Sequence, residues 1–389
     1  MNEWFTSLSV EQQFAVFSFL KIVIAVFAVV LPMVAYSVVA ERRISAWIQD
    51  RVGPNRVGIP FTKIPLWGLG QPIADGIKFI LKEDFTPAHV RKAYFWLAPA
   101  IVMVPALMTL AVIPFGSKIG AQDAVIANLN VGILYTFGIV SLGVYGIVLA
   151  GYASNSKYPF LGGIRASAQM ISYEIALGIS VVGVIMVYGT MDLSELVAHQ
   201  GELIWGFIPR WGIVVQPVAF IVFLVAALAE TKRLPFDLPE AESEIVGYFV
   251  EYSGMKFGMF FLTDFLETIV VASLATTLFF GGWQVPFLMP DGFHFPWGAE
   301  LPVHPLVYVL LGVASFSIKT LIFLFLFMQL RWTLPRFRYD QLMDLGWKVL
   351  IPAALVWVVL VATMRYVSTA YELGTQEILI GGGVLLALI

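Results

Sequence analysis

The 389-residue sequence contains no cysteine and few histidines. Without cysteine the chain cannot form disulfides, and it cannot hold an iron–sulfur cluster through the usual thiolate ligands. The four histidines all lie outside the apolar runs: His89, His199, His294 and His304. A b-type haem between membrane helices needs axial ligands inside the membrane. If the protein takes part in electron transfer, other chains must therefore carry the electrons.

Charge is also scarce, because only 13% of the residues are charged and 59% are hydrophobic. The mean hydropathy is +0.85, and repeated apolar runs predict an all-α polytopic membrane protein with a single membrane domain. Eight spans are predicted near residues 14–39, 94–114, 129–150, 168–190, 213–229, 257–281, 305–329 and 348–367. The first run lacks a basic flank and a small-residue cleavage site, so we interpret it as a retained span. Residues 376–389 are apolar but fewer than the ~17 needed to cross.

Basic residues predict the orientation of the chain. Of the 23 Lys and Arg residues, 18 fall in the segments that follow the first, third, fifth and seventh spans. We therefore expect the N-terminus outside and cytoplasmic loops at 40–93, 151–167, 230–256 and 330–348.

An amphipathic helix is predicted at residues 72–82. On a helical wheel Ile73, Ile77 and Ile80 share one side, whereas Asp75 and Lys78 share the other. The segment is too short to span a bilayer and suits the membrane interface.

A stretch of unusual acidity, residues 229–252, lies between the fifth and sixth predicted spans. It contains six acids: Glu230, Asp237, Glu240, Glu242, Glu244 and Glu251. If Pro239 opens a helix, then Glu240, Glu244 and Glu251 lie within about 40° of one another on it. A row of carboxylates beside a membrane is a functional-site hypothesis. The alternative is a solvated helix at the membrane surface.

Ionisable residues inside the predicted spans are few, and they include Glu174, Asp264, Glu267 and Lys319. Each costs several kcal/mol in hydrocarbon unless it faces a partner, a cavity or water. Asp264 and Glu267 are three residues apart and so share a helix face. Two carboxylates that lie so near each other in an apolar site interact strongly, and a proton relay requires such an interaction. The alternative is that each acid is hydrogen-bonded to a neighbouring helix.

Five long segments carry a resemblance to a known family. They are ERRISAWIQDRVGPNRVG (41–58), GQPIADGIKFILKED (70–84), SNSKYPFLGGIRASAQMISYE (154–174), AETKRLPFDLPEAESE (229–244) and RWTLPRFRYDQLMDLGWK (331–348). With these motifs in this order, the chain resembles the H-subunit family of respiratory complex I, which includes mitochondrial NADH dehydrogenase subunit 1. The resemblance extends over most of the chain.

The resemblance implies a membrane subunit of a proton-translocating NADH:quinone oxidoreductase. Residues implied to line or support the quinone chamber are Glu41, Arg42, Gln49, Arg51 and Asp75, with Arg336 and Arg338 in a loop that buttresses it. Residues implied to form an acidic path that couples quinone reduction to proton pumping are Glu174, Glu230, Asp237, Glu240, Glu242, Glu244, Glu251 and Asp264. At the position of Asp264 the family usually has a glutamate.

The resemblance also implies that this chain holds no cofactor and that quinone is the substrate. NADH, FMN and iron–sulfur clusters would belong to partner subunits of complex I in a bacterial plasma membrane, and no nucleic acid is expected. One alternative is the homologous membrane subunit of a hydrogenase or of a ferredoxin- or deazaflavin-linked dehydrogenase. Another is a stand-alone transporter, which predicts internal pseudo-symmetry and broken midplane helices. The sequence shows neither feature.

Overall fold

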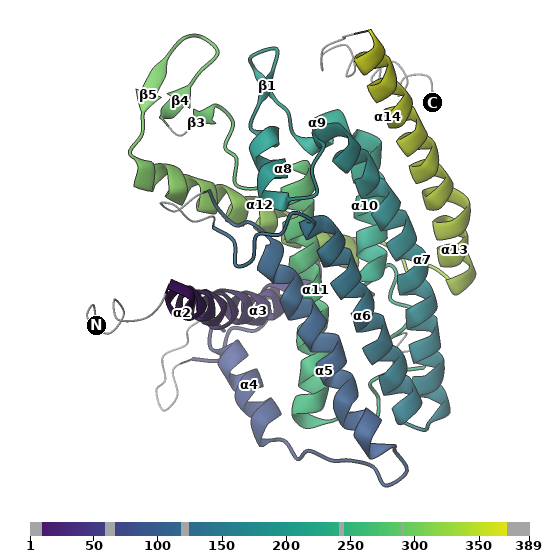
Figure 1. Cartoon of the computed structure of the whole chain (residues 1–389). Helices are drawn as coiled ribbons and strands as arrows, with labels where there is room; N and C mark the ends of the chain where they lie inside the picture. The colour runs from purple at the N-terminus through teal and green to yellow at the C-terminus, as the bar shows by residue number, and fades with distance from the viewer. Residues whose placement is uncertain (1–9, 59–66, 118–123, 241–244, 290, 372–389) are drawn as a thin grey trace. The chain divides into compact units, whose positions relative to one another are not determined.

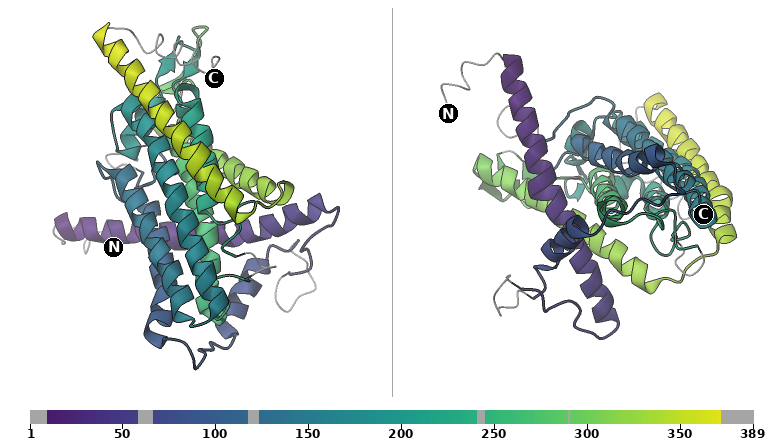
Figure 2. Two further views of the ribbon diagram at one scale, coloured as in Figure 1. Left: turned by 90° about the vertical axis from the view of Figure 1, so that its right-hand side faces the viewer. Right: turned by 90° about the horizontal axis from the view of Figure 1, so that it is seen from below.

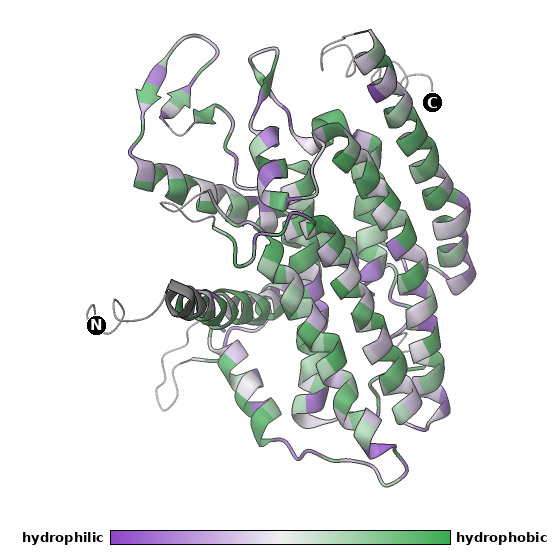
Figure 3. Ribbon diagram, in the orientation of Figure 1, coloured by the Kyte–Doolittle hydropathy of each residue, from purple (hydrophilic) through white to green (hydrophobic). Residues whose placement is uncertain are grey.

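The computed structural model describes residues 10–58, 67–117, 124–240, 245–289 and 291–371. Seven helices in these residues are long and apolar enough to cross a membrane. Hydrophobic residues predominate along them (Figure 3). The expected fold class, an all-α polytopic membrane protein, is confirmed.

The described elements follow one another in the order labelled in Figure 1. They are α2 (Val10–Val23), a π-helical turn (Ile24–Val30), α3 (Leu31–Ile48), α4 (Gln71–Leu81), α5 (Lys92–Thr109), a 3₁₀ turn (Leu110–Val112), α6 (Gly132–Ala153), α7 (Lys157–Tyr188), α8 (Leu193–Gln200), β1 (Leu203–Ile204), β2 (Ile208–Pro209), α9 (Gly212–Val215), α10 (Pro217–Glu230), α11 (Gly254–Phe279), β3 (Leu288–Met289), β4 (Gly292–His294), β5 (Glu300–Pro302), α12 (Pro305–Thr333), α13 (Tyr339–Asp344), a second π-helical turn (Leu345–Leu350) and α14 (Ile351–Ala370).

The chain divides into two compact units, Met1–Asp84 and Phe85–Ile389, and each is described by itself. In the first unit α2 continues through the π-helical turn into α3, and α4 forms where an amphipathic helix is predicted. An ion pair of 2.8 Å between Arg42 on α3 and Asp75 on α4 joins these two helices.

In the second unit α5, α6 and α7 lie side by side (Figures 1 and 2). Helix α7 also contacts α10 and α14, and α11 packs against α5 and α12. Phe95, Ile147 and Met170 are buried in the core between these helices. A Cβ at Gly146 would lie 2.9 Å from the backbone nitrogen of Val102, so only glycine allows α5 and α6 to approach this closely.

Two predicted loops are largely helical in the structure. Helix α6 ends at Ala153 and α7 begins at Lys157, so most of 151–167 belongs to α7. Pro159 lies in the first turn of α7, where its missing N–H has no helical partner to lose. Only residues 334–338 separate α12 from α13, so 330–348 is also mostly helical. Polar residues in these stretches lie on helices longer than the expected spans.

The predicted span at 213–229 is not one long helix. It consists of α9 and the 14-residue α10, which is shorter than the ~17 residues needed to cross. The break is at Gln216, with φ −134° and ψ 55°. Because Pro217 follows, helical backbone angles are disfavoured at Gln216.

Two small antiparallel sheets, which the sequence analysis does not predict, lie in connections between helices. One pairs β1 with β2, and the other has the order β3-β4-β5. Ile204 is opposite Ile208 in the first sheet, and Phe293 is opposite Leu301 in the second.

Candidate functional site

A buried ion cluster lies where α10 ends against α11. Lys232, two residues beyond the end of α10, has a side chain with 0% exposure. Its Nζ lies 2.8 Å from Glu267 Oε2 and 3.5 Å from Asp264 Oδ1. Asp264 and Glu267 are one helical turn apart on α11, so the predicted shared face is confirmed. The acid pair therefore faces a cation, as a buried pair of charges requires.

The acidic loop that follows Lys232 is held against α7. The Gln169 side chain donates hydrogen bonds to the carbonyl oxygens of Ala229 (2.7 Å) and Phe236 (2.8 Å). On the same helix, a Cβ at Gly162 would lie 2.9 Å from the Tyr248 backbone nitrogen. The glycine thus lets the loop backbone lie directly on α7.

Asp237 in this loop contacts a segment that is distant in the sequence. Its Oδ2 accepts a 2.8 Å hydrogen bond from Arg336, which lies between α12 and α13. The structure therefore joins an arginine predicted for the quinone chamber to an acid predicted for the path. Arg338 is instead exposed and pairs with Asp340, two residues away.

The helix expected to begin at Pro239 does not continue to Glu251. Residues 245–253 are turns and irregular backbone. Val246 has φ 66° and Gly247 has φ 112°, and neither angle is compatible with a right-handed helix. Glu240 and Glu251 therefore do not share a face of one continuous helix, and Glu244 lies outside the described residues.

The acids of that expected row have different surroundings or cannot be placed. Glu251 lies 3.8 Å from His89, and the side chains are 25% and 50% exposed. Glu242 and Glu244 lie outside the described residues. The carboxyl group of Glu240 is buried, and the charges of Asp264 and Lys232 act on it.

Burial and neighbouring charge shift the proton affinity of the loop groups. The pKa of Glu240 is raised well above its ordinary value, first by burial and then by the negative charges of Asp264 and Asp237. Burial alone would lower the pKa of Lys232, but Glu267 and Asp264 more than offset this effect and the pKa is raised. Glu240 therefore holds a proton more tightly than a solvated carboxylate does, and Lys232 keeps its positive charge.

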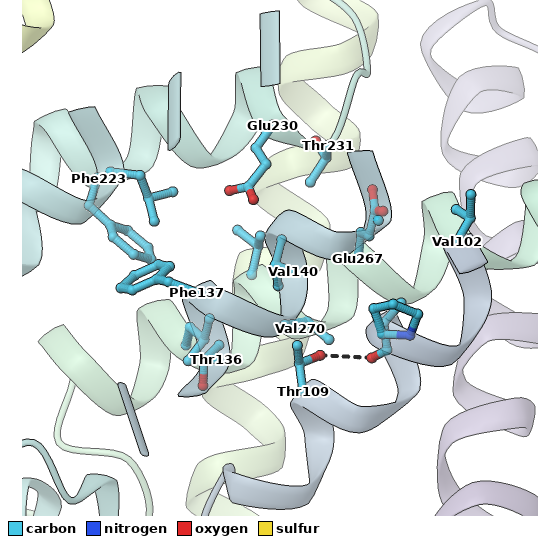
Figure 4. A pocket seen from close by; sticks show the side chains of 16 residues that line it. Val102, Thr109, Thr136, Phe137, Val140, Phe223, Glu230, Thr231, Glu267 and Val270 are labelled. Atoms are coloured by element: carbon cyan, nitrogen blue, oxygen red, sulfur yellow. Dashed lines mark hydrogen bonds between the residues drawn. The ribbon is translucent and has the colours of Figure 1, made fainter. Parts of the chain in front are cut away.

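A small cavity connects two of the acids. Figure 4 shows Glu230 and Glu267 on different sides of a space above Val140 and Val270. The cavity has a volume of about 30 Å³, enough for about two water molecules at ~10–15 Å³ each. Its walls are apolar apart from these carboxylates and three threonines. Water between the two carboxylates would have polar partners at both ends.

Glu174 lies on a different cavity. It accepts a short hydrogen bond from the Ser141 hydroxyl on α6. The cavity has a volume of about 570 Å³ and is lined by α5, α6 and α7, including Tyr145 and Tyr152. Glu174 therefore lines a different cavity from Glu230, although its charge acts on Glu230.

The residues predicted for the chamber in the first unit form two local groups. Asp75 pairs with Arg42 and is also 3.3 Å from Lys78. Arg51 Nε donates a 3.0 Å hydrogen bond to Gln49 Oε1 at the end of α3. Glu41 lies on α3 directly before Arg42. Each guanidinium group thus has a side-chain partner within the first unit.

Lys319 has a structural role in this arrangement. Its Nζ donates to the carbonyl oxygens of Phe280 (2.8 Å), Gly282 (3.0 Å) and Gln284 (2.7 Å). These carbonyls follow the end of α11, where the last helical oxygens lack helical partners. Lys319 thus caps α11 and lies apart from the acid cluster.

Sequence reasoning missed Lys232 as a site residue. The available signal was the pair of acids on α11, because two carboxylates in an apolar span need a nearby cation. Lys232 and Arg233, which follow α10 in the loop before α11, were the closest candidates in the sequence. In the part of the chain that the structure describes, no group of three or more His, Asp or Glu residues could hold a metal ion.

Comparison with known proteins identifies the family. A family model described as NADH dehydrogenase matches residues 20–362. The chain belongs to this family. The H subunit numbered 2 of the NADH-quinone oxidoreductase of Geobacter sulfurreducens is 51% identical over 336 residues, which cover 85% of this chain and 91% of the relative.

More distant members of the NADH dehydrogenase family match over a similar extent. The H subunit numbered 1 of the NADH-quinone oxidoreductase of Cytophaga hutchinsonii is 44% identical over 344 residues, covering 87% of this chain and 94% of the relative. The corresponding H subunit of Streptomyces avermitilis is 43% identical over 372 residues, covering 93% and 77%. The resemblance expected from the five motifs is therefore confirmed.

Proposed function

We propose that this chain is the H subunit of a proton-translocating NADH:quinone oxidoreductase in a bacterial plasma membrane. In this role it forms part of the quinone chamber and an acidic path that couples quinone reduction to proton pumping. The observation that carries the proposal is the buried ion cluster around Lys232, with Asp264 and Glu267 on α11 and Glu240 in the adjoining loop. Buried ionisable groups of this kind in membrane proteins are typical of proton paths.

The chamber residues would act on the quinone head. Reduction by two electrons, which partner subunits with NADH, FMN and iron–sulfur clusters would supply, is accompanied by uptake of two protons. A guanidinium group near the head stabilises anionic reduction states electrostatically. Arg42 and Arg51 are held by Asp75 and Gln49, and such fixed donors need little reorganisation when charge develops.

The Arg336–Asp237 pair would connect the chamber with the path. A change in charge near Arg336 alters the field at Asp237, 2.8 Å away. Asp237 in turn acts on Glu240, whose pKa it helps to raise. A proton held by Glu240 can then move to Asp264 while a carboxylate re-forms on Glu240.

Glu230 and Glu174 would continue the path. Glu230 lines a small cavity, and water there would provide the short hydrogen bonds that proton transfer needs. Glu242, Glu244 and Glu251 are part of the proposed path on the basis of the family motif.

The proposal is tested with Glu174→Gln and Glu240→Gln in the assembled complex. Each variant should keep the complex intact on a native gel but lose at least tenfold in NADH-driven proton translocation, because glutamine cannot accept and release a proton. The matched control is Glu300→Gln on β5, an exposed position with a 74% exposed side chain. Normal translocation in the double variant would refute the acidic path. If the tagged chain purifies without NADH:quinone oxidoreductase activity, the assignment to this complex is wrong.

A further inference from the structure

The two carboxylates beside Lys232 are held differently. Glu267 Oε2 accepts a 2.8 Å hydrogen bond from the ammonium group. Asp264 Oδ1 lies 3.5 Å from the same group, which is an electrostatic contact without a hydrogen bond. Both acids come from one face of α11, so both lie beside Lys232 at these different distances.

Asp264 Oδ1 is a buried acceptor that is left open. It accepts no hydrogen bond from any residue that the structure describes. Buried polar atoms normally have a partner, and an open one often marks a site for water or a proton. The hydroxyl group of Tyr248 is likewise buried without a hydrogen bond within the described residues. Burial, and after it the negative charge of Asp264, raises the pKa of Tyr248.

Glu267 is the better counter-ion. A buried ammonium group needs a charged partner at hydrogen-bond distance, and removing such a partner is strongly unfavourable. The Arg233 guanidinium adds positive charge near Glu267 and lies 4.0 Å above the Phe265 ring. Two cations, Lys232 and Arg233, therefore act on Glu267, whereas Asp264 lies near Lys232 and the acid Glu240.

We propose that Glu267 is the fixed counter-ion of Lys232 and that this pair positions Asp264 as the carboxylate that exchanges a proton in the path. Lys232 is thus a positioning residue that does not itself transfer the proton. When Asp264 gains a proton its donor loses one, so the net charge of the path is unchanged while the negative charge moves. This inference rests on the proposed function and adds a division of roles within the cluster.

Charge counting predicts the outcome of paired substitutions. The trio of Lys232, Asp264 and Glu267 carries a net charge of −1 when all three are ionised. Lys232→Met changes this to −2 and Glu267→Gln changes it to 0, whereas the double variant K232M/E267Q restores −1. If Glu267 is only a counter-ion, the double variant should recover function that the Lys232 variant loses.

The experiment measures NADH-driven proton translocation in the purified, reconstituted complex. We expect K232M to lose at least tenfold, K232M/E267Q to return to within about threefold of the native rate, and Asp264→Asn to lose at least tenfold. The control is removal of the exposed pair of Lys348 and Asp344, 2.7 Å apart, with K348M/D344N, which should leave the rate unchanged.

A pH profile separates positioning from a merely structural role. Charged groups that face the trio are Glu240 from the loop, Arg233 beside Lys232, and Glu230 across the cavity. These groups are present in all variants. Because Glu267→Gln removes a negative charge beside Asp264, the acidic limb of the translocation profile should move to lower pH. This variant keeps the cation and provides the test if K232M fails to assemble.

Three results distinguish the possible failures. Normal translocation in D264N would refute the proposed path itself. If D264N is impaired, and K232M/E267Q assembles but is as inactive as K232M, only the division of roles is overturned. An E267Q variant as inactive as D264N, or one with an unshifted acidic limb, would make Glu267 a member of the path and also overturn it.

Discussion

The contact between Arg336 and Asp237 makes a quantitative prediction. The side chains are 33% and 9% exposed, with a single nitrogen–oxygen distance of 2.8 Å. Exposed pairs contribute about 0.2–1 kcal/mol, whereas breaking a fully buried pair costs about 3–5 kcal/mol. This partly buried pair should lie between these limits, and we expect a coupling energy of about 1–2 kcal/mol, or roughly five- to thirtyfold in rate.

The assay is NADH:quinone turnover in the assembled complex for R336Q, D237N and the double variant. Each single variant should lose about tenfold, and the double variant should be no worse than the worse single variant, because all three remove the same interaction. Lys348→Gln, which removes an exposed cation of the same segment, is the control and should have little effect. If the loss of turnover in the double variant equals the product of the two single losses, a direct link between the loop of Arg336 and the path is refuted.

Three further predictions concern the loop and the topology. The pKa of Glu240 is higher in the folded protein than in the unfolded chain, so the stability linked to its proton is lost as pH rises through the raised value. The ratio of the inactivation rate at alkaline pH to the rate at neutral pH should therefore be lower for Glu240→Gln than for the native complex, and an unchanged ratio would contradict this. Gly162→Ala should destabilise the acidic loop by about 1–3 kcal/mol, measured by hydrogen exchange. Gly178→Ala on the same helix should not, because a Cβ there would have no atom within 4 Å, and equal effects of the two substitutions would contradict the close approach at Gly162. Single cysteines at the exposed positions Lys82 and Glu300 should react with membrane-impermeant maleimide only from the cytoplasmic and the outer side respectively, and labelling of both from one side would contradict the orientation.

Local spacing was sufficient to predict several features of the fold and the site. The apolar runs predicted long helices, the alternation of Ile73 and Ile77 with Asp75 and Lys78 predicted α4, and the separation of Asp264 from Glu267 predicted their common face. These features depend on helical periodicity, which is a property of neighbouring residues.

Features that depend on distant contacts were not predicted. Lys232 meets the acids of α11 across 35 residues, and Arg336 meets Asp237 across 99. The expected helix cannot continue from Pro239 to Glu251 because Val246 and Gly247 have positive φ angles, and the contact near Gly162 holds the loop on α7. Helical propensity in this loop was overridden by tertiary packing.

The central claim is that a buried carboxylate beside Lys232 transfers protons during quinone reduction. The most direct measurement is the number of protons translocated per NADH oxidised by the reconstituted complex with Asp264→Asn. We expect an assembled complex in which this ratio falls towards zero or coupled turnover stops. An assembled variant with the native ratio and the native rate would contradict it.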